Sequence, residues 1–385
     1  MKVLILGMDG YLGFVTMLRM ISKGHEVTGI DNFAKRKSLK KNNLISAFNV
    51  KRIEQRIELC KEFWKNKPQF YECSTVDSDK LKTVIRKTKP DVIFNFAEIP
   101  SAPYSMKNLK SCIQTWRDNT EGTLTLLWAM KEFAPKAHLI KLGTMGEYGQ
   151  PNVPIAEGYF KYRTPEGKHS DVLPFPKQAG SFYHQTKVAD TYNIAMTCKQ
   201  WKLSCTDIMQ GIIYGTKTPE IEKTGIRTMF YFDETFGTVI NRFTSSVIID
   251  HPIPVYGKGN MTRAILSLPD AINCYELIMK KRAGIGEHRV INQFDEWKNV
   301  SEMSKIVFNV ASKMGYKPKI KNYKNPRVER EFHFYKPESK KLKKLGYKRG
   351  KLFEEVVVDM LTDLEKVKSR IIKFKHVIPP TTQWR

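Results

Sequence analysis

A tyrosine and a lysine four positions apart form the pair of side chains best suited to chemistry. Tyr183 and Lys187 lie in the stretch GSFYHQTK, and the residues that follow have the mixed apolar spacing of a helix. Residues i and i+4 share one face of a helix, so both side chains can point into the same space. A nearby ammonium lowers the pKa of a phenol from its ordinary value of about 10. The pair predicts a general base, and the alternative is an exposed pair on a solvated helix.

Three further side chains could complete this site. Thr144 follows the apolar run 138–142 (HLIKL), and ligands of α/β proteins bind at the carboxyl ends of strands. We therefore expect Thr144 to bind the substrate hydroxyl from which Tyr183 takes a proton. His184 and Glu147 are candidates for further proton transfer, because an imidazole titrates near neutral pH and a carboxylate can act as a base. The alternative for His184 is a ring that only lines the pocket or the core.

A glycine pattern at the start of the chain predicts a dinucleotide site. Gly7, Gly10 and Gly13 lie between an apolar run and a helical segment, where glycines allow the backbone to approach a pyrophosphate. Asp31 ends the next apolar run, and its carboxylate is placed to hold a ribose hydroxyl, which favours NAD over NADP. Alternatives are a turn cap at Asp31 and a 2′-phosphate bound by one of the basic residues Lys35, Arg36 and Lys37. The residues expected to bind NAD are Gly7, Asp9, Gly10, Tyr11, Leu12, Gly13, Asp31, Asn32, Arg36, Ser74, Thr75, Phe96, Ala97, Glu98, Asn119, Tyr183, Lys187 and Gln210.

Strands and helices must alternate to bring these residues together. Apolar runs typical of buried strands alternate with helical segments, which predicts an α/β fold with a doubly wound parallel sheet of the Rossmann type. A polar stretch, 38–67, is expected to be a helical insertion. Asn119 falls inside a long helical segment, 108–133, where it either reaches the active-site lysine or merely kinks the helix. The predicted strands are 2–7, 25–30, 69–73, 91–97, 138–142 and 204–210.

Composition excludes several classes of protein. The 385 residues carry a formal net charge of +26, but the lysines are scattered and no helix-turn-helix, zinc-finger or RNP signature gathers them, so we expect no nucleic-acid partner. No apolar run reaches the roughly 18 residues of a membrane span. The six cysteines form no C-x-x-C pair, which favours a reducing, cytoplasmic setting and no metal site.

The motifs together resemble a known family. The G-x-x-G-x-x-G turn, Asp31, NTEGT (119–123), Thr144 and Y-x-x-x-K resemble the extended short-chain dehydrogenase/reductases that modify nucleotide sugars. Within them, the match to the UDP-sulfoquinovose synthase family covers nearly the whole chain, through GTMGEYG (143–149), SAPYSM (101–106), SFYHQTK (181–187), FGTVINRF (236–243), VYGKG (255–259) with Thr262 and Arg263, and NPRVE (325–329).

The resemblance implies a reaction and its partners. UDP-glucose and sulfite would give UDP-6-sulfoquinovose through 4-keto and 5,6-ene intermediates, with a new carbon–sulfur bond and with NAD regenerated. It implies a homodimer formed through helices 108–133 and 183–201. It leaves open whether the sulfosugar is destined for a lipid or a protein glycan. The alternatives are a UDP-sugar 4-epimerase or dehydratase, and a non-catalytic NAD-binding or nucleic-acid-binding protein. Sugar 4,6-dehydratases carry an Asp-Glu pair directly after the threonine, where this chain has Met145 and Gly146.

The resemblance also implies a division of the chain. Residues 1–215 would form the NAD-binding domain with the catalytic residues, joined by later segments near 236–250 and 262–295. Residues 216–385 would mainly bind the UDP-sugar and end in an extended tail, 377–385. Pro100 stands where the family has an arginine, so sulfite would rely on Ser101, His184 or backbone groups. Arginine forks suit a diphosphate, and the expected substrate residues are Ser101, Thr144, Met145, Gln210, Arg227, Thr238, Arg242, Tyr256, Arg263, Gln293 and Arg327.

Overall fold

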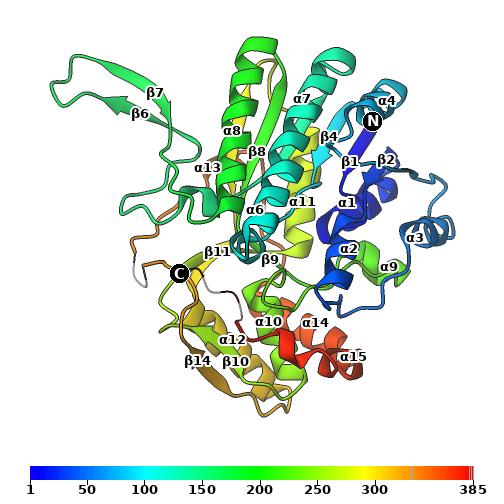
Figure 1. Cartoon of the computed structure of the whole chain (residues 1–385), viewed down its shortest axis with the longest axis vertical. Helices are drawn as coiled ribbons and strands as arrows, with labels where there is room; N and C mark the ends of the chain where they lie inside the picture. The colour runs from blue at the N-terminus through cyan, green and yellow to red at the C-terminus, as the bar shows by residue number, and fades with distance from the viewer. Residues whose placement is uncertain (331–332, 381, 383, 385) are drawn as a thin grey trace.

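A parallel sheet of seven strands forms the centre of the upper part of the molecule in Figure 1. The computed structural model describes residues 1–330, 333–380, 382 and 384. The strand order is β12-β8-β5-β4-β1-β2-β3, and every neighbouring pair is parallel. This confirms the predicted doubly wound sheet. The strands are β1 (Lys2–Leu6), β2 (Glu26–Asp31), β3 (Gln69–Glu72), β4 (Val92–Asn95), β5 (His138–Thr144), β8 (Ser204–Gln210) and β12 (His288–Gln293).

Helices cover both faces of this sheet, because the central strands are apolar on both sides. On one face α1 packs against α9 and α11, and on the other α7 packs against α4 and α8. The expected insertion between β2 and β3 holds two short helices, α2 and α3. The bounds are α1 (Tyr11–Ser22), α2 (Ala34–Lys41), α3 (Ile53–Cys60), α4 (Ser78–Thr88), α7 (Gly122–Phe133), α8 (Phe182–Trp201), α9 (Pro219–Thr224) and α11 (Leu268–Lys280).

The helical segment predicted over 108–133 is interrupted in the middle. Helix α6 (Leu109–Trp116) passes through a π-helical turn at Arg117–Glu121 before continuing as α7. A π turn commonly marks a functional position in a helix. A short helix, α5 (Ala102–Met106), precedes it, and Ser101 caps α5 by accepting the Tyr104 N–H at 3.1 Å.

The remaining elements are small sheets and helices, most of them in the lower part of Figure 1. Helix α10 packs against α12 and α14 around a separate apolar core. Positions 381, 383 and 385 of the predicted tail lie outside the described residues. The elements are β9 (Ile212–Tyr214), α10 (Val239–Ile248), β10 (Ile253–Tyr256), β11 (Thr262–Ser267), β13 (Glu296–Asn299), α12 (Val300–Lys313), β14 (Ile320–Tyr323), α13 (Lys340–Lys344), α14 (Phe353–Glu365), α15 (Lys368–Ile372) and a 3₁₀ turn (Lys375–Val377).

A β-hairpin that the sequence reading missed projects from the molecule beside α8 (Figure 1). Strands β6 (Tyr159–Arg163) and β7 (Ser170–Pro174) pair with each other in antiparallel register. The alternating YFKYR and the turn residues TPEGK (164–168) are the signals that predict a hairpin.

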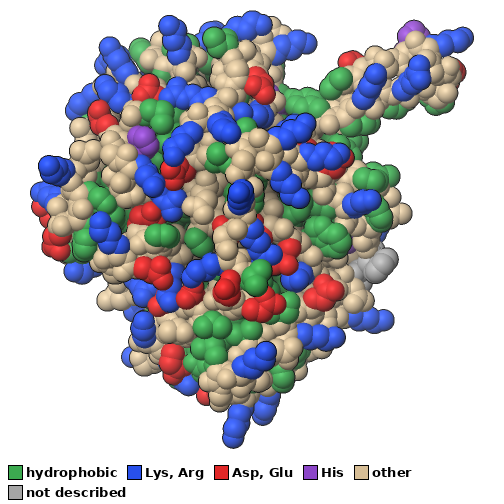
Figure 2. Space-filling model, turned by 180° about the vertical axis from the view of Figure 1, so that it is seen from behind, with side chains coloured by type: hydrophobic (Ala, Val, Ile, Leu, Met, Phe, Trp, Pro, Cys, Tyr) green, Lys and Arg blue, Asp and Glu red, His purple; other side chains and the backbone are tan. Residues whose placement is uncertain are grey.

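On one face of the molecule the surface charge is spread rather than gathered. Figure 2 shows Lys and Arg side chains over the whole of the face it draws, with Asp and Glu between them. Among the described residues, no helix is long and apolar enough to cross a membrane.

Candidate active site

A cavity of about 710 Å³ runs along the carboxyl ends of the central strands and on toward β10 and β11. Ligands of α/β sheets bind at this edge. Predicted residues outside its lining are Arg36, Asn119, Glu147, Arg227 and Gln293. Predicted residues that line it are Gly7, Asp9, Gly10, Tyr11, Leu12, Gly13, Asp31, Asn32, Ser74, Thr75, Phe96, Ala97, Glu98, Ser101, Thr144, Met145, Tyr183, His184, Lys187, Gln210, Thr238, Arg242, Tyr256, Arg263 and Arg327.

The glycine turn at one end of the cavity leaves no room for side chains. A Cβ atom on Gly13 would lie 2.1 Å from the Gly7 carbonyl oxygen, and one on Gly7 would lie 2.7 Å from the Phe96 carbonyl oxygen. Gly7 has a φ of +81°, which L side chains rarely adopt. Helix α1 begins directly after Gly10 without a side-chain cap, and Tyr11, Leu12 and Gly13 of its first turn line the cavity. This geometry fits a pyrophosphate at the start of α1.

Asp31 is held rigidly beside this turn. Its carboxylate accepts the Asp9 N–H at 2.9 Å and the Phe33 N–H at 2.8 Å. Burial and the Asp9 carboxylate raise the pKa of Asp31 to about 6. Arg36, which we expected at the cofactor, instead donates from Nε to Asp9 at 2.5 Å and from its terminal nitrogens to the carbonyls of Val50 and Lys51. These partners satisfy the hydrogen-bond donors of the guanidinium and hold it outside the cavity.

Asn119 also lies behind the cavity wall rather than in it. Its Oδ1 accepts the Ile99 N–H at 2.7 Å, and its Nδ2 donates to Thr186 Oγ1 at 3.0 Å. The residue occupies the π turn between α6 and α7 and is almost fully buried. Asn119 therefore fastens the loop after β4 to the helix that carries Tyr183.

Thr144, Tyr183 and Lys187 line the same cavity. Thr144 ends β5 and lines the cavity with Tyr183, which lies in the first turn of α8. The Lys187 ammonium lies 5.8 Å from the centre of the Tyr183 ring. It donates to the Leu142 carbonyl at 2.5 Å and pairs with Glu98. The predicted arrangement of hydroxyl, phenol and ammonium is therefore present in one place.

The protonation of these groups differs from the sequence-based expectation. Burial, followed by the Glu147 carboxylate, raises the pKa of Tyr183 above its ordinary value. Burial lowers the pKa of Lys187 to about 8. The expected lowering of the phenol's pKa is absent because burial disfavours the charged phenolate more than the nearby positive charge of Lys141 favours it.

His184 faces the same cavity as a neutral ring. Burial, followed by the charges of Arg327 and Arg263, lowers the pKa of His184 to about 3. Its Nδ1 lies 3.0 Å from the hydroxyl of Ser181, the N-cap of α8. His184 therefore does not titrate near neutral pH, contrary to the sequence-based expectation. A neutral imidazole can accept a proton at its unprotonated nitrogen, but it is not the charged imidazolium that acts as a general acid.

Glu147, the other candidate for proton transfer, points away from the cavity. Its carboxylate is fully buried and pairs with Lys177 and, at 3.4 Å, with Lys141. It also accepts the Thr144 N–H at 3.2 Å. A side chain that is shielded from the cavity cannot exchange protons with a substrate, so the structure removes Glu147 from the set of candidate catalytic groups.

Basic and aromatic groups line the far end of the cavity. Arg263 donates to Glu329 at 2.5 Å, the guanidinium of Arg327 lies 5.1 Å from the Trp384 ring centre, and Arg242 lies 4.8 Å from that of Tyr256. This combination of guanidinium groups and ring faces suits a nucleoside diphosphate. Ser101, Met145, Thr238 and Gln210 line the cavity between the two ends.

Two predicted substrate residues have structural partners instead. Arg227 makes a two-pronged contact with Asp363 at 2.7 and 3.0 Å. Gln293 is fully buried and accepts from Gln210 Nε2 at 2.8 Å, so it supports a lining residue from behind. In both cases a partner that is distant in the sequence holds the side chain outside the lining of the cavity.

Several lining or supporting residues escaped sequence reasoning. His333 and Trp384 line the cavity, and Lys141 lies fully buried behind it. Lys35, one of the basic residues considered for a 2′-phosphate, also lines the cavity. A lysine inside the apolar strand HLIKL is a usable signal, because a buried ammonium requires carboxylate partners. Among the described residues, no cluster of His, Cys, Asp and Glu is arranged to hold a metal ion.

Comparisons with known proteins agree with this geometry. Residues 3–292 match the NAD dependent epimerase/dehydratase family. The chain is 40% identical over 385 residues to the UDP-sulfoquinovose synthase of Sulfolobus acidocaldarius, covering all of this chain and 98% of that one. It is 37% identical to the chloroplastic UDP-sulfoquinovose synthase of Spinacia oleracea, covering all of this chain and 79% of that one. A Bacillus cereus UDP-glucuronic acid 4-epimerase mutant, solved with a fluorinated UDP-sugar and NAD, has the same fold, with a TM-score of 0.71, 19% identity and coverage of 95% and 100%.

Proposed function

Since this chain belongs to the NAD dependent epimerase/dehydratase family, and within it to the family of the UDP-sulfoquinovose synthases, we propose that it converts UDP-glucose and sulfite to UDP-6-sulfoquinovose. The observation that carries the proposal is that Thr144, Tyr183 and Lys187 meet in one cavity between a glycine turn and an arginine-lined end. Met145 and Gly146 follow the threonine, where an acidic pair would favour a plain dehydratase.

NAD fits the glycine end of the cavity. The closely packed turn at Gly7 and Gly13 admits a pyrophosphate against the start of α1, and the Asp31 carboxylate is placed for a ribose hydroxyl. When bound, NAD would accept the C4 hydride of the sugar and later return it. Residues 1–215 would hold the dinucleotide, and the part from 216 onward would supply most of the UDP-sugar contacts.

Side chains of the protein would carry out the proton transfers on the sugar. Thr144 holds the C4 hydroxyl by a hydrogen bond while Tyr183 takes its proton, which leaves a C4 ketone after hydride loss. The ketone acidifies the C5 proton, and loss of that proton with the C6 hydroxyl releases water. The sulfite sulfur then bonds to C6, a proton returns to C5, and the C4 hydroxyl is restored. The net change is UDP-glucose plus bisulfite to UDP-6-sulfoquinovose plus water.

Because Glu147 is shielded from the cavity, His184 is the remaining candidate for proton transfer at C5 and C6 of the sugar. It lies beside Tyr183, its ring centre 5.0 Å from the phenol ring, and it is uncharged near neutral pH. A neutral imidazole accepts the C5 proton and then carries it as a charge that can assist the departing hydroxyl. Its Ser181 contact fixes the ring's orientation.

Sulfite would bind near the same ring. The Ser101 hydroxyl is committed, since it donates to the Thr235 carbonyl and accepts from Tyr104. Arg263 and Arg327 impose their positive charge on His184, and the same charge attracts a small anion to that part of the cavity. These arginines would offset the loss of an arginine at Pro100 while also binding the diphosphate.

A homodimer would cover the apolar side of the helices beside the site. Exposed apolar residues gather on α6, α7 and α8, which is unusual for a helix surface facing water. The exposed fractions are 74% for Leu109, 56% for Ile113, 49% for Trp128 and 47% for Met196. We expect Ile113→Glu to give a monomer by size-exclusion chromatography with light scattering, whereas Val172→Glu on the hairpin leaves a dimer. A monomer in the unmodified protein would contradict the dimer.

The six free thiols are consistent with a reducing compartment such as the cytoplasm.

The function is tested by incubating the purified protein with UDP-glucose and sulfite and analysing the product by mass spectrometry. We expect a sulfonated UDP-hexose, and a loss of about 10²- to 10⁴-fold in Tyr183→Phe, because the base is missing. The matched control is Tyr192→Phe, on the same helix with a side chain 45% exposed. Formation of UDP-galactose alone would replace the proposal with a UDP-sugar 4-epimerase.

A further inference from the structure

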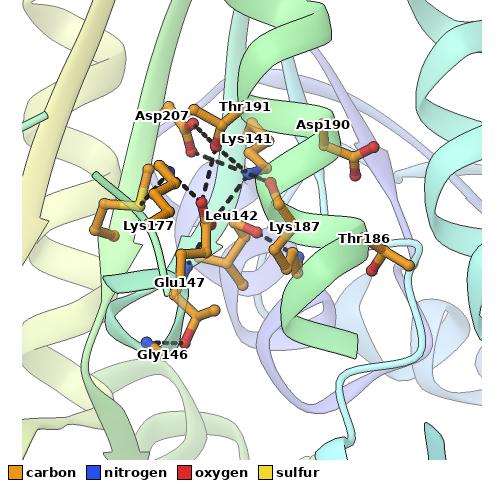
Figure 3. Close-up of polar contacts among 12 residues, drawn as sticks. Lys141, Leu142, Gly146, Glu147, Lys177, Thr186, Lys187, Asp190, Thr191 and Asp207 are labelled. Atoms are coloured by element: carbon orange, nitrogen blue, oxygen red, sulfur yellow. Dashed lines mark hydrogen bonds and ion pairs between the residues drawn. The ribbon is translucent and has the colours of Figure 1, made fainter. Parts of the chain in front are cut away.

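We propose that four buried charged residues, Lys141, Glu147, Lys177 and Asp207, position Thr144 and α8 and set the charge around Tyr183. We call them the buried charge cluster. Its side chains are between 0% and 4% exposed. Figure 3 shows Lys141 between Asp207 and Glu147, behind the helix that carries Lys187. The inference rests on the proposed function, because it assigns these residues a part in the same reaction without contact with the substrate.

Glu147 fixes the backbone of Thr144. Thr144 precedes a short 3₁₀ turn, Met145–Tyr148, and the Glu147 carboxylate accepts the Thr144 N–H at 3.2 Å. The Thr144 hydroxyl in turn accepts the Gly146 N–H at 3.1 Å. This capping box holds the threonine at the carboxyl end of β5. A change at Glu147 is therefore transmitted to the hydroxyl that would hold the sugar.

Lys141 joins that turn to α8. Its ammonium lies 3.4 Å from Glu147 Oε1 and 3.4 Å from Asp207 Oδ1, and it donates to the Lys187 carbonyl at 3.2 Å. It also donates to the Thr191 hydroxyl at 3.1 Å. One side chain thus contacts the β5 turn, β8 and a full turn of α8, which sets the distance between Thr144 and Lys187.

Lys177 extends the cluster to the segment that enters α8. Its ammonium pairs with Glu147, and the neighbouring Gln178 N–H donates to the Glu147 carbonyl at 3.1 Å. Gln178 and Gly180 line the cavity, and Ser181 caps the helix on which Tyr183 lies. The segment that precedes Tyr183 is therefore bound to the same Glu147 carboxylate that accepts the Thr144 N–H.

Stability alone does not account for this cluster. Buried ion pairs are costly to desolvate, and apolar residues of similar volume are often as stable. Burial would lower the pKa of Lys141, but Asp207 and Glu147 outweigh it and raise that pKa, so the ammonium stays charged. Two positive and two negative charges leave the cluster neutral, and any single substitution unbalances it next to Tyr183.

The cluster acts on Tyr183 with two opposite signs. Glu147 raises the pKa of the phenol, and Lys141 lowers it. The other charged or titratable groups around the phenol are His184, Lys187 and Asp190 on α8, Glu98 after β4, and Arg263 and Arg327 at the arginine end. These residues are the same in every variant of the cluster, so pKa shifts of opposite sign in Glu147→Gln and Lys141→Met are assigned to the charges of the cluster.

The test compares Glu147→Gln, Glu147→Ala and Lys141→Met in the NAD-loaded protein. The readout is the rate of nicotinamide reduction on mixing with UDP-glucose, which is monitored by absorbance at a series of pH values. The acid limb of this pH–rate profile reports the pKa of the base. We expect Glu147→Gln to move that limb to lower pH and Lys141→Met to move it to higher pH, each by about one unit. Glu147→Ala, which also loses the Thr144 N–H contact, should in addition lower kcat by about 10- to 100-fold with an unchanged KM.

Two controls keep the outcome decisive. Glu132→Gln removes the carboxylate of a surface pair with Lys82, 2.9 Å apart, and should shift nothing. If Lys141→Met does not fold, as judged by circular dichroism and NAD content, Lys177→Met replaces it, since it also removes a positive charge from the cluster. Shifts of the same sign, or no shift, would overturn the inference. A wild type that reduces nicotinamide yet forms no sulfonate would overturn the proposed function and leave the inference standing.

Discussion

At the scale of the residue, the site is governed by which charges are already paired. Lys187 is neutralised by Glu98, and Glu147 is neutralised by two lysines, so neither is available in the way its sequence position suggests. Residue types and spacing were enough to predict Thr144, Tyr183 and Lys187, because a strand end and an i, i+4 pair are local features. Partners at long sequence separation, such as Asp363 for Arg227, are invisible to that reasoning.

A pH prediction follows for His184. Because burial and the two arginines lower its pKa to about 3, the ring stays neutral from pH 8 down to about pH 4. Lowering the pH through the ordinary value of about 6.5 should therefore not protonate it. The measurement is NMR of ring-labelled histidine, with His184→Asn to assign the signal. A titration midpoint near 6.5 would contradict the burial and the arginine effect, and Arg327→Gln should move the midpoint upward.

At the scale of the element, the positions of the strand ends create the site. The carboxyl ends of β1, β2, β4, β5 and β8 meet at one edge, and the glycine turn lets α1 begin close to it. Alternating apolar runs predicted this sheet well. The π turn at Asn119 and the β6–β7 hairpin were not predicted as such, since the first depends on contacts with Ile99 and Thr186 and the second on a short exposed segment.

A substitution at Gly13 tests whether the close packing of the glycine turn is needed to bind NAD. In Gly13→Ala the new Cβ would lie 2.1 Å from the Gly7 carbonyl oxygen, which forces the turn to open. Overpacking of this kind costs about 1–3 kcal/mol, so NAD affinity should fall by roughly tenfold or more. Isothermal titration with NAD measures it. Gly284→Ala is the control, because its nearest neighbour is 3.4 Å away, and an equal loss there would contradict the argument.

The hairpin should contribute little to stability. Both strands are paired only to each other in the sheet, and Tyr162, Val172 and Leu173 are exposed. A two-stranded hairpin of this kind is marginally stable by itself. Replacing 161–172 with Asn-Gly should change the Tm by no more than about 2 °C, measured by thermal unfolding. A fall of more than about 5 °C would show that the segment packs on the body of the protein.

At the scale of the whole molecule, one cavity joins the two halves of the chain. The elements of the large sheet supply the glycine turn, Thr144, Tyr183 and Lys187, while Arg242, Tyr256 and Arg327 come from the second half of the chain. Helix α10 shares an apolar core with α12 and α14 from the last third of the chain, and this long-range packing cannot be inferred from the local sequence pattern. On the face that Figure 2 draws, Lys and Arg side chains are distributed over the surface, whereas Arg242, Arg263 and Arg327 are gathered in the lining of the cavity.

The central claim is that the C4 hydride leaves the sugar and returns to it while sulfite takes the place of the C6 hydroxyl. The most direct measurement is incubation with sulfite and UDP-glucose carrying deuterium at C4, followed by mass spectrometry of the product. We predict a sulfonated UDP-hexose that retains the deuterium, because the NAD held against α1 returns the hydride it accepted. Loss of the deuterium from the sulfonated product, or labelled UDP-galactose without any sulfonate, would contradict the account.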